Sequence, residues 1–112
     1  MNAQYNYIAA VLSDEIVIYC ATSDKKKLLK TLGAKSKIFN HQTWYLKYKK
    51  NDENDLGCML TKLRDFGFCF AGSAGGWPPA AIFEHLREKR LVTGKIIEIL
   101  WRAPNKAITI ER

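Results

Sequence analysis

The sequence predicts a two-layer α+β domain, with three short helices packed on one side of a mixed β-sheet. Segments with the two-residue period of a strand alternate along the chain with segments of helical period, which gives the expected order ββαβαβαββ. Such an order also occurs in three-layer α/β folds, whose strands are buried on both faces and apolar throughout. Most of the long strand segments here alternate apolar and polar residues. We therefore expect the two-layer form and keep the three-layer fold as the alternative.

One domain, residues 1–112, is expected to account for the whole chain. A length of 112 residues is close to the modal size of a single domain. Hydrophobic residues make up 47% and charged residues 26% of the chain, a composition typical of a protein that folds around its own core. The sequence has no linker, internal repeat or low-complexity tract that would support a second domain.

Three strands are predicted in the first half of the chain. Tyr7 to Leu12 and Ile16 to Ala21 are apolar, β-branched or aromatic, and the polar residues 13–15 between them predict a hairpin turn. Thr43 to Lys49 alternates strictly, which indicates a strand with one solvated face. Its two sides are Trp44, Leu46 and Tyr48 on one and Tyr45, Lys47 and Lys49 on the other.

The first two helices have recognisable end signals. A helix is expected over Lys25 to Leu32, because Ser23 can cap its start and Gly33 can end it in the left-handed conformation. A second helix follows the polar turn at residues 51–54 and stops at Gly67. Its apolar residues have the spacing of a single buried stripe: Leu56, Met59, Leu60 and Leu63.

The second half continues with one strand, one helix and a hairpin. Phe68 to Ala71 is a short apolar strand. Prolines at 78 and 79 are tolerated in the first turn of a third helix, whose inner face is Ile82, Phe83 and Leu86. Lys95 to Trp101 and Ala107 to Glu111 flank a Pro-Asn turn and predict a closing hairpin.

Positive charge is concentrated in one segment, Lys25 to Lys50. This segment contains nine lysines and no aspartate or glutamate, while the remaining residues carry nine basic and eleven acidic side chains, so the formal net charge of +7 arises locally. Such a field attracts polyanions, and lysines favour diffuse phosphate contact over the reading of individual bases. The predicted nucleic-acid-binding residues are Tyr45, Lys47, Lys49, Lys50, Lys25, Lys26, Lys27, Lys30, Lys35 and Lys37.

The solvated face of the strand at 43–49 joins this charge to an aromatic ring. A sheet surface with Tyr45 beside Lys47 and Lys49 has the chemistry of platforms that bind single-stranded nucleic acid by stacking and phosphate contact. We therefore expect a small basic module that binds a polyanion, with nucleic acid as the first candidate and weak sequence preference. Lysine-rich segments also serve simply to solvate an outer face, which is the competing interpretation.

A protein-interaction module is the alternative function, as an inhibitor, adaptor or subunit that selects an acidic partner. The three tryptophans, Trp44, Trp77 and Trp101, are of the residue type that anchors interfaces. An unpaired hairpin edge is also compatible with a homodimer.

A glycine-rich loop is a second candidate site, for an anion or a partner. Gly72, Ser73, Gly75, Gly76 and Trp77 lie between a predicted strand and a predicted helix, a context in which backbone N–H groups can hold an anion. The pattern matches neither G-x-G-x-x-G nor G-x-x-x-x-G-K-[ST], and prolines at 78 and 79 lack two of the N–H donors. A tight surface loop, with Trp77 against the core or exposed to a partner, is the other interpretation.

No catalytic or metal-binding signature is present in the sequence, so no catalytic residue, metal or cofactor is predicted. His41-Gln42-Thr43 forms one half of a paired-histidine phosphoesterase signature, and His85 does not supply the other half. The third hypothesis is therefore a small phosphoester-directed enzyme that uses His41 with a second titratable group nearby.

Cysteine usage and hydropathy suggest a reducing, cytoplasmic environment. Cys20, Cys58 and Cys69 are an odd number without a C-x-x-C pair, which argues against a disulfide framework and a zinc site. Each lies in an apolar segment, where a thiol is expected to be buried. The longest uncharged stretch contains Phe66 to Ile82 and is interrupted by glycines and prolines, so neither a membrane helix nor a secretory segment is predicted.

Overall fold

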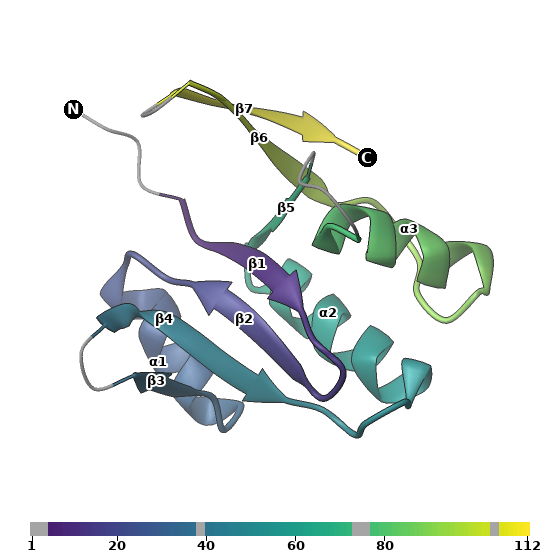
Figure 1. Cartoon of the computed structure of the whole chain (residues 1–112), viewed down its shortest axis with the longest axis horizontal. Helices are drawn as coiled ribbons and strands as arrows, with labels where there is room; N and C mark the ends of the chain where they lie inside the picture. The colour runs from purple at the N-terminus through teal and green to yellow at the C-terminus, as the bar shows by residue number, and fades with distance from the viewer. Residues whose placement is uncertain (1–4, 38–39, 73–76, 104–105) are drawn as a thin grey trace.

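A seven-stranded mixed sheet with three helices forms the protein in the computed structural model, which describes residues 5–37, 40–72, 77–103 and 106–112 (Figure 1). The element order is ββαββαβαββ. The elements are β1 (Tyr7–Val11), β2 (Glu15–Tyr19), α1 (Ser23–Thr31), β3 (Lys35–Lys37), β4 (Asn40–Lys47), α2 (Glu53–Asp65), β5 (Cys69–Ala71), α3 (Pro79–Glu88), β6 (Ile97–Ala103) and β7 (Lys106–Glu111).

The sheet has the strand order β3-β4-β2-β1-β5-β6-β7. The two pairs that involve β5 are parallel, and the other pairs are antiparallel. Parallel pairing is possible here because α2 connects β4 to β5 and α3 connects β5 to β6, which gives each crossover the length it needs. The predicted mixed sheet is confirmed.

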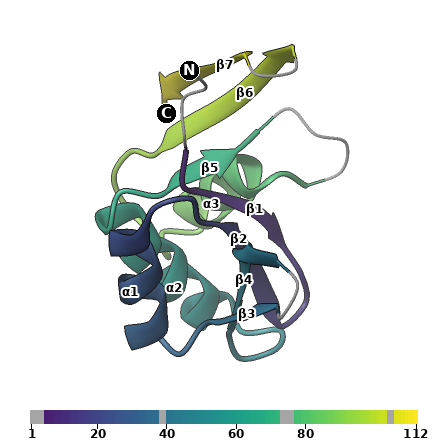
Figure 2. The ribbon, with the colours of Figure 1, turned by 90° about the vertical axis from the view of Figure 1, so that its left-hand side faces the viewer.

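All three helices pack on the same face of the sheet, which confirms the two-layer form and excludes the three-layer alternative (Figure 2). Residues that pair in register on this face are buried on neighbouring strands, and they join one core with residues of each helix. The strand residues are Ile8, Ile18, Trp44 and Phe70, and the helix residues include Leu29, Leu60 and Phe83. The Phe70 and Phe83 rings meet edge to face, with centroids 5.3 Å apart.

One strand was missing from the predicted order ββαβαβαββ. Residues 35–37 pair with β4 as a three-residue edge strand, although Lys-Ser-Lys has no apolar pattern that would indicate a strand. Backbone pairing alone therefore sets its conformation. The strand predicted at 43–49 begins earlier, at Asn40, and ends at Lys47, so Lys49 lies in the turn that follows.

The start of α1 differs from the prediction in its cap. Thr22, not Ser23, is the N-cap residue, and its side chain makes no capping hydrogen bond. The side chain of Asn6 holds this turn instead, because its Oδ1 accepts from the backbone N–H of Ala21 at 2.7 Å and of Thr22 at 3.3 Å. The predicted stop at Gly33 is confirmed by its φ of 88°, in the left-handed region.

The predicted apolar stripe of α2 is confirmed, but the predicted burial of its cysteine is not. Asp52 caps α2 by accepting the N–H of Asp55 at 3.0 Å. Cys58 lies on the exposed side of this helix, so the expectation that all three thiols are buried is wrong for Cys58. Cys20 lies in the core, Cys69 is half-buried on the sheet face opposite the helices, and burial raises the pKa of both thiols. All three cysteines are free.

Arg112 forms ion pairs with one residue of the sheet and one residue of α3. Its guanidinium donates to the carboxylate of Glu98 at 2.7 Å and also to that of Glu84 on α3. Glu98 is buried beside Gly72, where an added Cβ would come within 2.2 Å of the carboxylate. Residue 72 is therefore a glycine because the Glu98 side chain occupies the place of any larger group.

Candidate nucleic-acid interface

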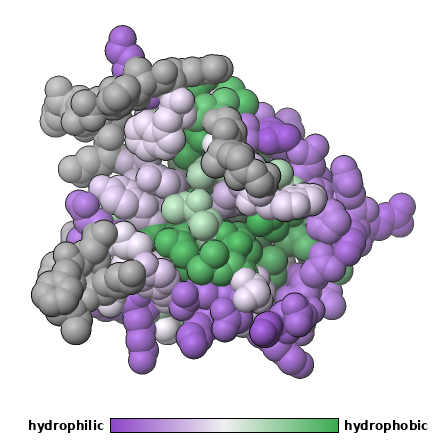
Figure 3. All heavy atoms as spheres, in the orientation of Figure 1, coloured by the Kyte–Doolittle hydropathy of each residue, from purple (hydrophilic) through white to green (hydrophobic). Residues whose placement is uncertain are grey.

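The sheet face opposite the helices is left uncovered by the described helices over β1, β2 and β4. Strand residues alternate between faces, so the neighbours of the buried Ile18 and Trp44 point to this side. We call this side the open face. It is turned towards the viewer in Figure 1, and Figure 3 shows apolar and weakly polar residues in its middle with hydrophilic residues along the lower rim.

Four aromatic side chains form a cluster at one end of the open face. Tyr7 lies opposite Tyr19 in the register of β1 and β2, and their rings stack with centroids 5.3 Å apart. Trp101 of β6 contacts Tyr7 at 6.1 Å and Tyr5 at 6.2 Å, both in edge-to-face arrangements. The aromatic cluster is thus Tyr5, Tyr7, Tyr19 and Trp101.

The aromatic cluster combines half-buried tyrosines with one exposed tryptophan. Trp101 keeps 47% of its surface exposed, and the hydroxyl of Tyr19 donates to Oε1 of Gln42 at 3.0 Å. Burial, and secondarily the nearby Tyr19, raises the pKa of Tyr7, so this phenol remains protonated at neutral pH. The small side chain of Cys69 lies beside Tyr7 in the register of β1 and β5. The ring of Tyr7 is therefore a neutral surface.

Predicted site residues continue from this cluster along β4. Tyr45 is the diagonal neighbour of Tyr19, because Thr43 lies directly opposite Tyr19 and Tyr45 is two residues further on. Lys35 of the edge strand β3 pairs with Tyr45, and both Lys35 and Lys47 are exposed. Glu15 lies directly opposite Lys47 and offsets part of its charge. The open face thus places lysines beside aromatic rings.

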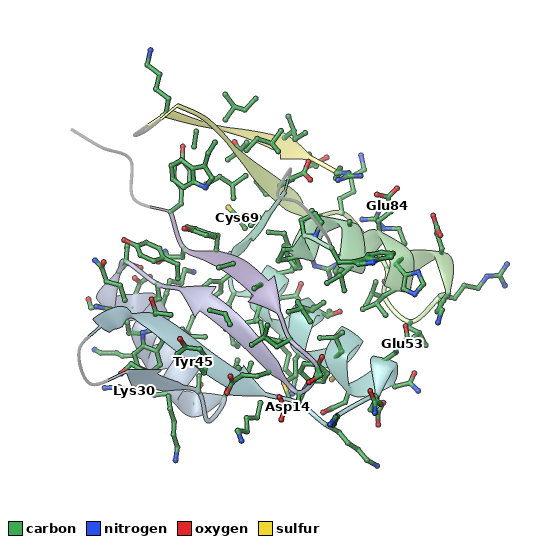
Figure 4. The ribbon with its side chains drawn as sticks, in the orientation of Figure 1. Asp14, Lys30, Tyr45, Glu53, Cys69 and Glu84 are labelled. Atoms are coloured by element: carbon green, nitrogen blue, oxygen red, sulfur yellow. The ribbon has the colours of Figure 1, made fainter. Side chains whose placement is uncertain are left out.

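The lysines of α1 do not belong to this face. Lys27 and Lys30 are exposed on a helix that packs on the other side of the sheet, as Figure 2 shows; Figure 4 labels Lys30 there and Tyr45 on β4. Lys25 and Lys26 are half-buried, and the Lys25 ammonium donates to the carbonyl of Phe66. The charge of the segment 25–50 is therefore divided between the two sides of the domain.

The remaining predicted basic residues lie outside both groups. Lys49 and Lys50 are exposed in the turn before α2, where the backbone N–H of Lys49 donates to Asp55 at 2.7 Å. Acidic residues of this turn thus surround the two lysines. The side chains of Lys37 and His41 fall outside the described part of the structure. The hypothesis that His41 acts with a second titratable group therefore stays a prediction.

The glycine-rich loop has only its two ends in the described structure. Gly72 is buried against the carboxylate of Glu98, a negative group that disfavours an anion at this point. Trp77 is 66% exposed, and its ring contacts His85 at 5.6 Å. Ser73, Gly75 and Gly76 lie outside the described residues. Trp77 is therefore exposed and not packed against the core, and its contact with a partner stays a prediction.

Other surface features offer little for catalysis. A shallow hollow of about 130 Å³ between the β1–β2 turn and the start of α2 is lined by Ser13, Tyr48, Asn51, Asp52, Glu53 and Leu56. Within the described ranges, no group of three or more potential metal ligands comes together. None of the helices described is long and apolar enough to cross a membrane.

Most of the aromatic cluster was not singled out from the sequence. Tyr5, Tyr7 and Tyr19 lie in or beside the predicted first hairpin, and Trp101 in the predicted last one, but nothing in the sequence links these two hairpins. Strict alternation along β1 would not have indicated it, because the register of β1 and β2 shifts between Ile8 and Ala10.

Comparison of the chain with known protein families, with curated proteins and with solved structures gives no match.

Proposed function

We propose that the protein binds single-stranded nucleic acid across the open face. The observation that carries this proposal is the position of the aromatic cluster, with its exposed Trp101, next to Tyr45 and Lys35 on a sheet face free of described helices. Bases stack on aromatic rings at about 1–3 kcal/mol each, and lysines beside them neutralise the phosphates. The open face contains both the aromatic rings for stacking and the lysines for phosphate contact.

The chemistry of the face sets the class of nucleic acid. Stacking requires unpaired bases, so single strands bind in preference to a duplex, whose bases are already stacked. Tyrosine, tryptophan and lysine lack the bidentate donors with which arginine and asparagine identify a base. Binding is therefore tolerant of sequence and strongly dependent on salt.

A pair of charge-reversal variants tests the location of the binding surface. Lys35→Glu/Lys47→Glu changes two exposed lysines of the open face, and Lys27→Glu/Lys30→Glu changes two exposed lysines of α1. Each substitution lowers the net charge by two, so the formal net charge of both variants falls from +7 to +3. The two variants differ only in which side of the sheet carries the substitutions. Affinity for a fluorescent oligothymidylate and for an oligouridylate is measured by anisotropy at several salt concentrations.

We expect the open-face variant to lose roughly tenfold or more in affinity and the helix variant less than about threefold. Because each phosphate contact to a single strand contributes about 0.7 to the slope of log affinity against log salt, the open-face variant should also have a slope shallower by about 1.4. Equal losses in the two variants would show that only net charge matters and would refute the open face as the binding surface.

An acidic protein partner is the second candidate, and the exposed tryptophans favour it. Trp101 at 47% and Trp77 at 66% exposure are unusually accessible for residues that commonly anchor protein interfaces. The discriminating experiment is capture of partners by the parent protein and by the open-face variant, with and without nuclease. Partners that survive nuclease treatment and are lost with the open-face variant would support the protein partner over nucleic acid.

A further inference from the structure

The outer edge of β7 is a terminal strand edge of the sheet with an apolar centre. β7 is the last strand of the sheet, and its six residues are exposed apart from the half-buried Ala107. Charged residues occur only at its two ends, Lys106 and Glu111. Ile108 and Ile110 between them are 41% and 42% exposed. A long apolar edge of this kind is a template for another strand.

The opposite edge of the same sheet is protected in the usual way. β3 has three residues, and two of them are lysines. Short length and lysine side chains are common means of keeping a sheet edge from pairing with other chains. The contrast between the two edges indicates that β7 is the one available for association.

Hydrogen bonding within the hairpin fixes which backbone groups of β7 face outwards. The N–H of Arg112 donates to Ile96 at 2.8 Å, and the register continues with Glu98 opposite Ile110. Even-numbered residues therefore bond to β6, because bonded and non-bonded pairs alternate along an antiparallel ladder. The N–H and C=O groups of the odd-numbered Ala107, Thr109 and Glu111 point to the free edge.

We propose that two copies of this chain associate through antiparallel pairing of β7 with β7, about a two-fold axis at Thr109. In this register Thr109 bonds to Thr109 of the second copy, and Ala107 bonds to Glu111 of the second copy in both directions. All three outward-facing residues then find partners, which gives six backbone hydrogen bonds from the three pairs. The interface is self-complementary, as two-fold symmetry requires.

The side chains support the same register. Ile108 of each copy lies opposite Ile110 of the other, so four isoleucines come together on one face of the joined sheet. A shift by two residues in one direction would set Lys106 opposite Ile110 and lose this apolar pairing. In the proposed register Lys106 faces Arg112 of the second copy, whose guanidinium is already paired with Glu84 and Glu98. The apolar contact thus supports Thr109 as the centre, and the Lys106–Arg112 juxtaposition is tolerated because Arg112 is already paired with two carboxylates.

The association should be of moderate strength. A contact of one strand per copy buries less than the roughly 1,200–2,000 Å² of a standard interface, so we expect a dissociation constant on the order of 10 µM. The formal net charge of +7 makes two copies repel, and salt screens this repulsion. Added salt therefore strengthens the dimer, whereas it weakens nucleic-acid binding. The two proposals consequently succeed or fail independently.

Sedimentation velocity over a range of protein concentrations tests the dimer. Thr109→Pro removes one outward N–H without disturbing the bonds to β6, and Ile110→Lys places a charge in the isoleucine contact. Both variants should weaken dimerisation at least about tenfold. Two matched controls should leave it unchanged: Thr109→Ala, which keeps the N–H, and Ile97→Lys, which puts the same charge on a 39% exposed isoleucine of β6.

Cysteine cross-linking tests the register. Ile108→Cys and Ile110→Cys are made separately with Cys58→Ser, because Cys58 is exposed. Non-bonded antiparallel pairs have Cα atoms about 4.5 Å apart, within the range of a disulfide. A mixture of the two variants should cross-link under oxidised glutathione, and each variant alone should not. A monomer at all concentrations, a dimer unaffected by Thr109→Pro, or cross-linking of Ile108→Cys with itself would overturn the proposal.

Discussion

Replacing Phe83 by alanine is expected to lower the free energy of unfolding by about 4 kcal/mol, because a fully buried aromatic ring leaves a cavity. Phe83 has no exposed surface, and its ring meets Phe70 edge to face. The guanidinium groups of Arg64 and Arg87 lie 5.7 Å and 5.3 Å from the ring centroid, so the substitution also removes two cation–π contacts.

Urea unfolding followed by circular dichroism measures this effect. The matched control is Phe83→Leu, which keeps most of the buried volume and should cost about 1.5 kcal/mol or less. A loss of about 4 kcal/mol is a large fraction of the 5–15 kcal/mol typical of a domain of this size. A loss below about 1 kcal/mol for Phe83→Ala would contradict the position of α3 against the sheet core.

Arg112→Ala is expected to cost about 3 kcal/mol, because it leaves the carboxylate of Glu98 buried without its cation. The Glu98 side chain is only 6% exposed, and the ion pair to Arg112 is 2.7 Å long. The same guanidinium binds Glu84 on α3, so the substitution also removes one contact to the helix layer, while the carbonyl of residue 112 can still accept from Arg87. Arg112→Lys keeps the charge but not the fork that reaches both carboxylates, and should cost less.

The double variant Arg112→Ala/Glu98→Gln separates the charge from the packing. If the cost arises from an unpaired buried carboxylate, removing its charge should restore part of the stability lost in Arg112→Ala. Unfolding free energies of the parent, both single variants and the double variant give the coupling energy. A double variant less stable than Arg112→Ala by the full cost of Glu98→Gln would mean that the two residues act separately.

Much of the fold follows from local sequence patterns. The apolar stripe on α2 and the alternation around Trp44 each specify an element and its buried face without tertiary information. The left-handed conformations of Gly33 and Gly67 specify where two helices end. The missed strand β3 has a sequence of Lys-Ser-Lys, whose propensity is poor for a strand. Its pairing with β4 is a tertiary effect, which a local pattern does not contain.

The aromatic cluster of the open face was less predictable than the fold, because it depends on a register shift in the first hairpin. Val11 pairs with Ile16, and continuing this register would place Tyr7 opposite Cys20. An irregularity between Ile8 and Ala10 shifts the register by one residue, so Tyr7 faces Tyr19 instead. Trp101 joins them from a strand more than 80 residues away along the chain. The sequence indicated Tyr45 and Lys47, but the ring surface beside them arises from the bulge and the strand order.

Only part of the basic segment 25–50 lies on the open face. Charge counting placed nine lysines together between residues 25 and 50. The fold separates the α1 lysines from Lys35 and Lys47 by the thickness of the sheet, because the segment passes through a helix and then through two strands on the other layer. The net charge therefore supplies a general attraction for polyanions, and the open face supplies the contacts.

The most direct test of binding through the open face is an amide and indole NMR titration with a short oligothymidylate. We predict shifts of the Tyr19 and Tyr45 amides and of the Trp101 indole N–H, while the indole of the buried Trp44 and the amides of Lys27 and Lys30 stay unchanged. Shifts centred on the α1 amides, or saturation of binding without any change at Trp101, would contradict the open face as the nucleic-acid interface.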